Sequence, residues 1–329
     1  MTYIDKTPFH NIYFSEVLEK NEAKILQEQS ENGNGKMICY DVASGIQISY
    51  NDLNMGSCYR PIIPEQDFLQ IDHCLEGCYE CESADGTVTF LREGDLSVGS
   101  LYKGKQSIIG SNIPLKKYKG ITVLFEIEKA QKAISENFGQ ADIDLKKIRD
   151  TLCSNGTLLL VKSKREIDHI FGELYSVDKR IQSPYFWIKT IELLLFLSLL
   201  DGTAMQKPQH FSEDISKRTQ KVYQYIIENP FDIKTIADLS EEFGIAESSL
   251  KRCFKSIAGK SIGTFIKVKR IEAAAEMLIT EPHLNIGEIA YAAGYENQSK
   301  FSAAFKSVMG KRRRLTDINM RDLIGLRFV

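Results

Sequence analysis

The 329-residue sequence has no apolar run long enough to cross a bilayer. Its most apolar stretch, Ile191–Leu200, is about half of the roughly 20 residues that a membrane-spanning helix needs. The stretch Met1–Phe14 mixes charged and polar side chains and lacks the apolar centre of a secretory signal. We therefore expect a cytoplasmic protein without a membrane partner.

The sequence also lacks the motifs of common catalytic sites. It has no Gly-rich phosphate loop, no Gly-x-Ser-x-Gly and no His-Glu-x-x-His. We expect that the protein is not an enzyme and that it binds no cofactor.

Cysteines are few and give no complete metal-binding set. Cys74, Cys78 and Cys81 lie close together beside His73, but no second Cys-x-x-Cys follows. On a regular strand Cys74 and Cys78 would face one way and Cys81 the other. We expect reduced, buried cysteines in a structural role and no metal.

The net charge of −2 conceals an uneven distribution. Residues 212–329 contain 19 Lys and Arg against 15 Asp and Glu, so residues 1–211 carry a net charge of −6. A modest basic excess fits either nucleic-acid binding or an ordinary solvated surface.

The first 128 residues change from a helical to a strand-like pattern. Apolar spacing in Ser15–Ser30 predicts a peripheral helix, and Glu31–Gly35 predicts a linker after it. Short alternating segments separated by turn residues then predict a small barrel or sandwich. The expected strands are Met37–Tyr40, Ile46–Tyr50, Phe68–Leu75, Gly77–Cys81, Thr87–Leu91, Asp95–Val98 and Ile121–Ile127.

Residues 129–201 are expected to form a helical connector. The predicted helices are Lys129–Phe138, Leu145–Cys153, Lys164–Val177 and Pro184–Leu200. The last is apolar on nearly all sides, so it could lie in the core or form a homodimer interface, and both remain open. Residues 202–212 contain Gly202 and Pro208 without periodicity and predict a linker.

The C-terminal part contains a helix-turn-helix pattern twice. Ile286–Gly310 has a short helix up to Gly294, a tight turn and a second helix with Phe301 and Phe305 four residues apart. Ile236–Gly259 repeats this order, with Gly244 in the place of Gly294. One such pattern is weak, but two in register point to a pair of DNA-reading motifs.

A long helix is expected between the two motifs, after a first helix at Glu213–Glu228. Ser261–Thr280 begins with a natural cap and would span roughly 30 Å. Successive major-groove faces of B-DNA lie about 34–36 Å apart. A rigid helix of this length could therefore hold two reading helices on one side of a duplex.

Residues 213–310 resemble the double helix-turn-helix domain of AraC/XylS-family transcription regulators. The resemblance lies in Ile286-Gly287-Glu288-Ile289-Ala290, Gly294-Tyr295, Gln298-Ser299, Phe301-Ser302, Phe305-Lys306 and the helix residues Arg270-Ile271, Ala274 and Met277-Leu278. The turn Gly94-Asp95-Leu96 resembles more loosely the cupin-like sensor of that family. The resemblance implies an α+β protein with an N-terminal cupin-like β-barrel in residues 1–128, a helical connector and an all-α DNA-binding domain in residues 213–329.

The end of the chain departs from the family. After Gly310 the family continues with a Pro-Ser/Thr start of a final helix, whereas this chain has Lys311–Arg314. The sequence therefore does not predict the usual final helix, and the basic cluster could contact phosphate or serve only solubility.

The resemblance places DNA-contacting side chains on the second helix of each motif. Base or phosphate contacts are expected from Ser248, Ser249, Lys251, Arg252, Lys255, Asn297, Gln298, Ser299, Lys300 and Lys306. The family often has arginine where this chain has Ala303, so the second motif is expected to read fewer bases.

A small-molecule effector is expected to change the placement of the DNA-binding domains or to expose a contact for RNA polymerase, as in an activator. Polar residues that could line its site are Tyr50, Arg60, His73 and Glu76, although core or rim positions suit each of them equally. Two alternatives remain open at this point. One is an architectural DNA-binding protein without an effector, and the other is a cupin-type enzyme fused to a DNA-binding domain.

Overall fold

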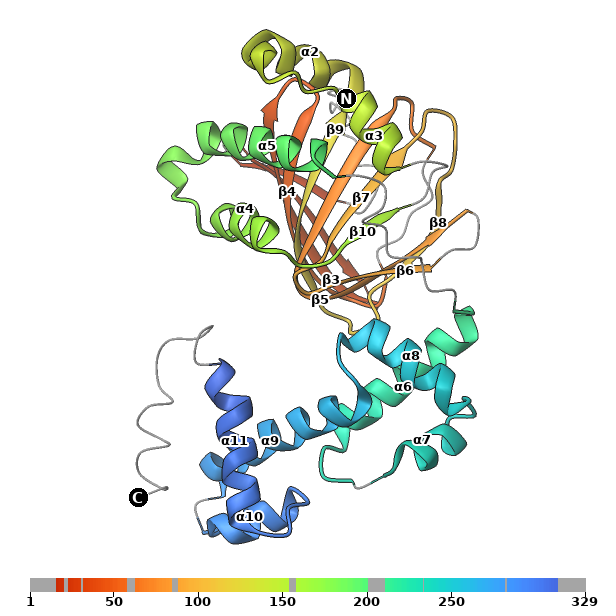
Figure 1. Ribbon diagram of the computed structural model, residues 1–329, viewed down its shortest axis with the longest axis vertical. Coiled ribbons are helices and arrows are strands. Elements are labelled where there is room, and N and C mark those ends of the chain that lie inside the picture. Colours follow the sequence, from red (N-terminus) through yellow and green to blue (C-terminus); the bar gives the residue numbers. More distant parts are fainter. Residues whose placement is uncertain are drawn as a thin grey trace. The chain divides into compact units, whose positions relative to one another are not determined.

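The chain forms two compact units, Met1–Ser212 and Glu213–Val329. The computed structural model describes residues 16–20, 23–30, 32–57, 63–84, 88–153, 158–200, 211–232, 234–281 and 283–312. Figure 1 shows a sheet with helices in the first unit and helices in the second. The α+β class that the sequence predicted is confirmed.

The N-terminal unit is built on an antiparallel sheet. Its strands are β1 Glu16–Lys20, β2 Ala23–Ser30, β3 Gly33–Ala43, β4 Ile46–Met55, β5 Phe68–Ser83, β6 Val88–Arg92, β7 Leu96–Leu101, β8 Ile108–Asn112, β9 Tyr118–Glu126 and β10 Leu159–Val161. The order is β1-β2-β3-β4-β9-β5-β7-β10, and β6 and β8 pair with the later part of β5.

Strand β5 changes partners along its length because it is bent by a β-bulge. Its first half pairs with β7 and β9, and its second half pairs with β6 and β8. The register shifts between Cys74 and Glu76, next to Gly77, which has a φ of +90°. A Cβ at Gly77 would lie 1.9 Å from the Lys117 carbonyl oxygen, so this position requires glycine. The sequence predicted two strands here, where the structure has one.

One face of the sheet is covered by four helices, α2 Ile127–Phe138, α3 Leu145–Leu152, α4 Arg165–Ser176 and α5 Gln182–Ser198 (Figure 1). Sheet residues such as Ile48, Ile71 and Val123 are almost completely buried against them, together with Phe171 and Phe186 of α4 and α5. All four predicted connector helices are present, and they pack on the sheet because each presents an apolar stripe to it.

The opposite face of the sheet has its own smaller core. Met37, Leu53 and Tyr118 are buried there, with Cys74 and Leu91. This second face encloses the cavities described below.

The predicted N-terminal helix is wrong, because its residues form the antiparallel hairpin of β1 and β2. Strand β2 in turn pairs with β3 along its whole length, and Gly33 at their turn has a φ of +129°. Apolar residues in adjacent pairs fit both the helical period of about 3.6 residues and the strand period of two residues. The segment forms a strand because it pairs with β3. Strands β8 and β10 were also not predicted.

The C-terminal unit contains α6 Glu213–Glu228, α7 Ile236–Glu242, α8 Glu247–Ala258, α9 Ile262–Thr280, α10 Ile286–Ala292 and α11 Gln298–Arg312. In the described part of the chain, no helix is both long and apolar enough to cross a membrane. The predicted linker at residues 202–212 lies almost wholly outside the described residues, and so does the tail after Arg312.

Candidate DNA-binding interface

The first helix-turn-helix motif consists of α7, a turn at Gly244 and α8. A capping box begins α7, in which Thr235 and Asp238 each bond the backbone N–H of the other. Gly244 has a φ of +62°, as its place at the end of the first helix predicted. Arg218 of α6 donates to the Gly244 carbonyl oxygen at 3.1 Å, which ties the turn to the rest of the unit.

Helix α8 is fixed by one buried face. Leu250, Cys253 and Phe254 are fully buried, and the Phe254 ring packs on Tyr223 and Phe265 at centroid distances of 5.9 and 5.3 Å. Because a helix buries one stripe, the residues between these positions must face outward. Exposed on α8 are Ser248, Lys251, Arg252 and Lys255, while Ser249 is half-buried.

The exposed cations of α8 differ in their surroundings. Lys251 Nζ lies 2.6 Å from Glu247 Oε2 one turn earlier, an exposed ion pair that contributes little to stability. Arg252 forms no hydrogen bond or ion pair within the described residues. Its five N–H donors are thus available for a partner outside the chain.

The second motif repeats the geometry of the first. Asn285 and Glu288 form a capping box at the start of α10, and Gly294 has a φ of +78°. Phe301 and Phe305 of α11 are buried, with ring centroids 5.6 Å apart. The predicted equivalence of the two copies therefore extends to the caps, the turn and the buried aromatic residues.

Asn297 has a role in α11 that the sequence reading did not identify. Its side-chain Oδ1 accepts from the Lys300 N–H at 2.9 Å, which makes Asn297 the N-cap of the helix. Gln298, Ser299, Lys300 and Lys306 are exposed, as is Ala303. Lys300 Nζ lies 2.5 Å from Glu296, so this ion pair resembles that of Lys251 and Glu247.

Helix α9 joins the two motifs by packing into both (Figure 1). Near its start Phe265 packs on Tyr223 at 4.6 Å between centroids, and further along Ile271 and Ala274 are buried against α10 and α11. Arg270 donates to the carbonyl oxygens of Pro230 and Asp232, which closes the loop after α6. The two motifs are thus parts of one packed unit.

Of the sequence-predicted ligand residues of the N-terminal unit, the three that the structure describes do not line a common cavity among the described residues. The Tyr50 hydroxyl donates to the Leu174 carbonyl oxygen at 2.6 Å, and His73 stacks on Phe171 at 4.3 Å between centroids. Both lie on the helix-covered face. Glu76 pairs with Lys117 at 2.7 Å in a half-exposed position, and Arg60 lies outside the described residues.

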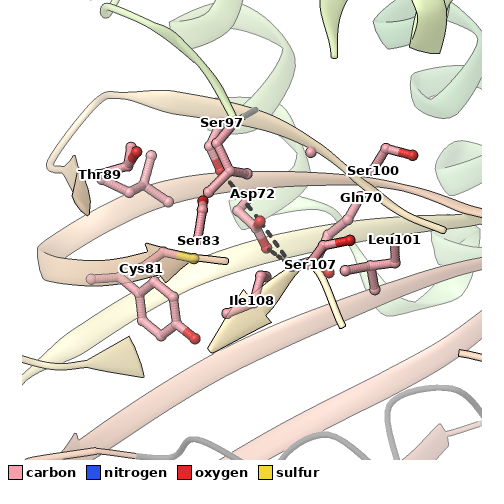
Figure 2. Close-up of a pocket in the computed structure, with 14 residues that line it drawn as sticks. Gln70, Asp72, Cys81, Ser83, Thr89, Ser97, Ser100, Leu101, Ser107 and Ile108 are labelled. Atoms are coloured by element: carbon pink, nitrogen blue, oxygen red, sulfur yellow. Dashed lines mark hydrogen bonds between the residues drawn. The ribbon is translucent and has the colours of Figure 1, made fainter. Parts of the chain in front are cut away.

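A cavity lies instead on the opposite face of the sheet, beside β5 (Figure 2). Its volume is about 30 Å³, and a smaller one of about 20 Å³ adjoins it through Asp72 and Tyr79. Asp72 was missed by the sequence reading. The alternation of polar Gln70 and Asp72 with apolar Leu69 and Ile71 was the available signal, because alternate residues of a strand share a face.

The three clustered cysteines are buried. Burial raises the thiol pKa of Cys74, Cys78 and Cys81, which keeps each thiol protonated. The bulge shifts the alternation expected along β5, so that Cys81 lines the same cavity as Asp72. The prediction that Cys74 and Cys78 share one face of the strand while Cys81 points to the other is therefore wrong.

Comparison with known proteins matches the C-terminal unit. Residues 239–312 match the family model described as a helix-turn-helix domain. A stretch of 96 residues is 31% identical to the HTH-type transcriptional activator AarP of Providencia stuartii, covering 28% of this chain and 70% of that protein. A putative AraC-like transcription regulator of Streptomyces lividans is 36% identical over 76 residues, which are 23% of this chain.

This chain spans a quarter of the length of the Streptomyces lividans relative. Among solved structures, fatty-acid-bound ToxT from Vibrio cholerae matches over 80% of this chain and 92% of that chain, with 18% identity and a TM-score of 0.35. The repeated helix-turn-helix motif, its geometry and the match to 70% of AarP all indicate the same protein family. The chain belongs to the AraC/XylS family of DNA-binding transcription regulators.

Proposed function

We propose that this protein is a sequence-specific transcription regulator that reads two successive major-groove segments and responds to a small-molecule effector. The observation that carries the first part is α9, which packs into both motifs. Its 19 residues span about 28 Å at 1.5 Å per residue, close to the one-turn spacing of about 34–36 Å between groove faces.

Each motif contributes a different share of the contacts. On α8, Ser248, Ser249, Lys251 and Arg252 face base edges, and Lys255 contacts phosphate. On α11, Gln298, Ser299 and Lys300 follow the cap at Asn297, and Lys306 contacts phosphate. Position Ala303 has no hydrogen-bonding side chain, so α8 carries more of the specificity than α11.

The effector site belongs to the N-terminal sheet, which we take as the sensor in residues 1–128. Support comes from a cavity that contains polar side chains and the half-buried carboxylate of Asp72, on the sheet face that the helices leave uncovered. Residues 129–201 act as the connector, and residues 213–329 as the DNA-binding domain.

Helix α5 forms the interface of a homodimer in this proposal. Ile188, Leu195 and Leu199 are 58, 42 and 85% exposed, and the first two are seven residues apart on one helix face. A dimer would place four reading helices on one DNA site. Action in the cytoplasm through a contact with RNA polymerase completes the proposed mechanism.

Selection of bound sequences from random DNA tests this function. The full chain at a stated salt concentration is expected to recover a motif in two segments about one helical turn apart, because both motifs are held by α9. Adding a cell metabolite extract is expected to change the affinity. Binding without sequence preference and without response to the extract would instead indicate an architectural DNA-binding protein.

A further inference from the structure

The cavity of the N-terminal unit contains a half-buried carboxylate whose partners among the described residues are all neutral. Asp72 accepts hydrogen bonds from Thr122 Oγ1 at 2.7 Å, Gln70 Nε2 at 2.9 Å and Ser97 Oγ at 3.3 Å. Within the described chain, no lysine or arginine pairs with it. Burial raises the pKa of Asp72, because a carboxylate removed from water is costly unless an opposite charge lies beside it.

A second observation at the same cavity is independent of the first. Thr89 of β6 is 7% exposed and lines the cavity, yet its Oγ1 has no hydrogen-bond partner in the described part of the protein. Buried hydroxyl groups nearly always have a partner, so the Thr89 hydroxyl group is available to bond a ligand in this cavity.

The lining residues determine which charge a ligand can carry. Among the described residues that line this cavity there is no lysine, arginine or histidine, so none of them would compensate the charge of an anion beside the Asp72 carboxylate. The cavity volume of about 30 Å³ admits roughly two water-sized groups, enough for the head of a ligand. Leu101 and Ile108 offer apolar surface for a short carbon chain (Figure 2).

We propose that this cavity binds the ammonium end of a small primary amine, with Asp72 as its counter-ion. The N–H donors of the ammonium group match the Asp72 carboxylate and the Thr89 hydroxyl oxygen. Naming this amine as the effector rests on the proposed function, whereas the binding itself does not.

Three matched compounds test the charge requirement. 1,4-Diaminobutane, 1,4-butanediol and butanoate each have four carbons; the first carries an ammonium group at both ends, the second a hydroxyl group at both ends and the third a carboxylate at one end. Titrated into the full-length protein at constant ionic strength and followed by calorimetry, only the diamine is expected to bind saturably. Equal binding of the diol, or tighter binding of butanoate, would overturn the proposal.

Two substitutions locate the bound amine. Asp72→Asn keeps the shape of the side chain and removes the charge, so diamine affinity is expected to fall about 10- to 100-fold. Thr89→Val should weaken binding less and provides a second variant if Asp72→Asn folds poorly. Asp52→Asn is the matched control, because Asp52 lies on the same sheet in an exposed ion pair with Lys119. Equal affinity in all three variants would contradict the assignment.

The same preparations separate this inference from the proposed function. DNA affinity is measured for a selected site with and without 1,4-diaminobutane. If the diamine binds through Asp72 but leaves DNA affinity unchanged, the cavity assignment stands and the effector response fails. If the extract changes DNA affinity while no amine binds to the cavity, the proposed function stands and the cavity assignment fails.

Discussion

Two neighbouring residues of β5 show how a strand gives adjacent side chains opposite surroundings. Asp72 faces the cavity, while His73 faces α4, where its Nδ1 lies 3.1 Å from the Tyr175 hydroxyl oxygen. The His73 Nε2 is buried without a partner among the described residues. Burial lowers the pKa of His73 to about 4, although Asp168 and Asp95 act in the other direction.

The lowered pKa of His73 predicts acid sensitivity of the N-terminal unit. The unfolded chain binds this proton more tightly than the folded one, so stability is lost as the pH falls from 6.5 to about 4. The linked loss is about 3 kcal/mol in the free energy of unfolding at most. His73→Phe removes the titrating group and keeps a ring to stack on Phe171, so this part of the pH dependence should disappear.

Urea unfolding of the full chain, followed by fluorescence of the single tryptophan Trp187, measures the effect. Trp187 packs on Phe138 at 5.4 Å between ring centroids, so it reports on the N-terminal unit. Tyr175→Phe is the matched control, because it breaks the same hydrogen bond and retains the histidine. The idea fails if His73→Phe and the parent lose equal stability between pH 6.5 and 4.

Single-residue roles were the least predictable from the sequence. The outward positions on α8 followed from helix periodicity, because Leu250, Phe254 and Ile257 mark the buried stripe. Asn297 was expected to contact DNA, yet its side-chain oxygen caps α11, and a capping role depends on where the helix begins. Asp72 was missed because a polar residue in a strand can face either solvent or an enclosed cavity.

At the scale of elements, the helices were predicted more closely than the strands. Helices α2 to α9 lie within a few residues of their predicted bounds, since a helix contains its own period. Strand β10 has three residues and pairs with β7, about sixty residues earlier in the chain, so no local sequence pattern predicts it. The residues of the β1–β2 hairpin were predicted to form a helix for a different reason, since their apolar residues in adjacent pairs fit the helical period as well as the strand period.

The proposed homodimer interface on helix α5 can be tested by substitution. Ile188→Ser combined with Leu195→Ser should raise the dissociation constant of a homodimer about 10- to 100-fold, because each apolar side chain is buried twice in a symmetric interface. Monomer stability should change by less than about 1 kcal/mol, since both side chains are exposed.

Sedimentation velocity over a range of protein concentrations measures this constant. Ile279→Ser on α9 is the matched control, because Ile279 is 58% exposed, as is Ile188, but belongs to the other unit. A monomeric parent protein, or a dimer that the double variant leaves intact, would rule out α5 as the interface.

At the scale of the whole molecule, the chain divides into a unit with a sheet and a unit of helices. This division follows the change in the sequence from short alternating segments to helical periodicity. The sequence predicted an N-terminal sensor and a separate connector, while the structure places the connector helices on the sheet as part of the same compact unit. The double motif was predictable because its turn glycines and aromatic residues recur about fifty residues apart, with one extra turn residue in the later copy. The cavity was not, since it forms where β5, β6, β7 and β8 come together.

The central claim is that α8 and α11 read separate halves of one site, and Arg252→Ala tests it most directly. Sequence selection with this variant should lose preference in one half only, at a cost of about 1–3 kcal/mol in discrimination. Lys255→Ala, as the matched control, should weaken binding to all sequences alike and leave the motif intact. An unchanged motif bound with parental affinity by Arg252→Ala, or equal loss of preference in both halves, would contradict the account.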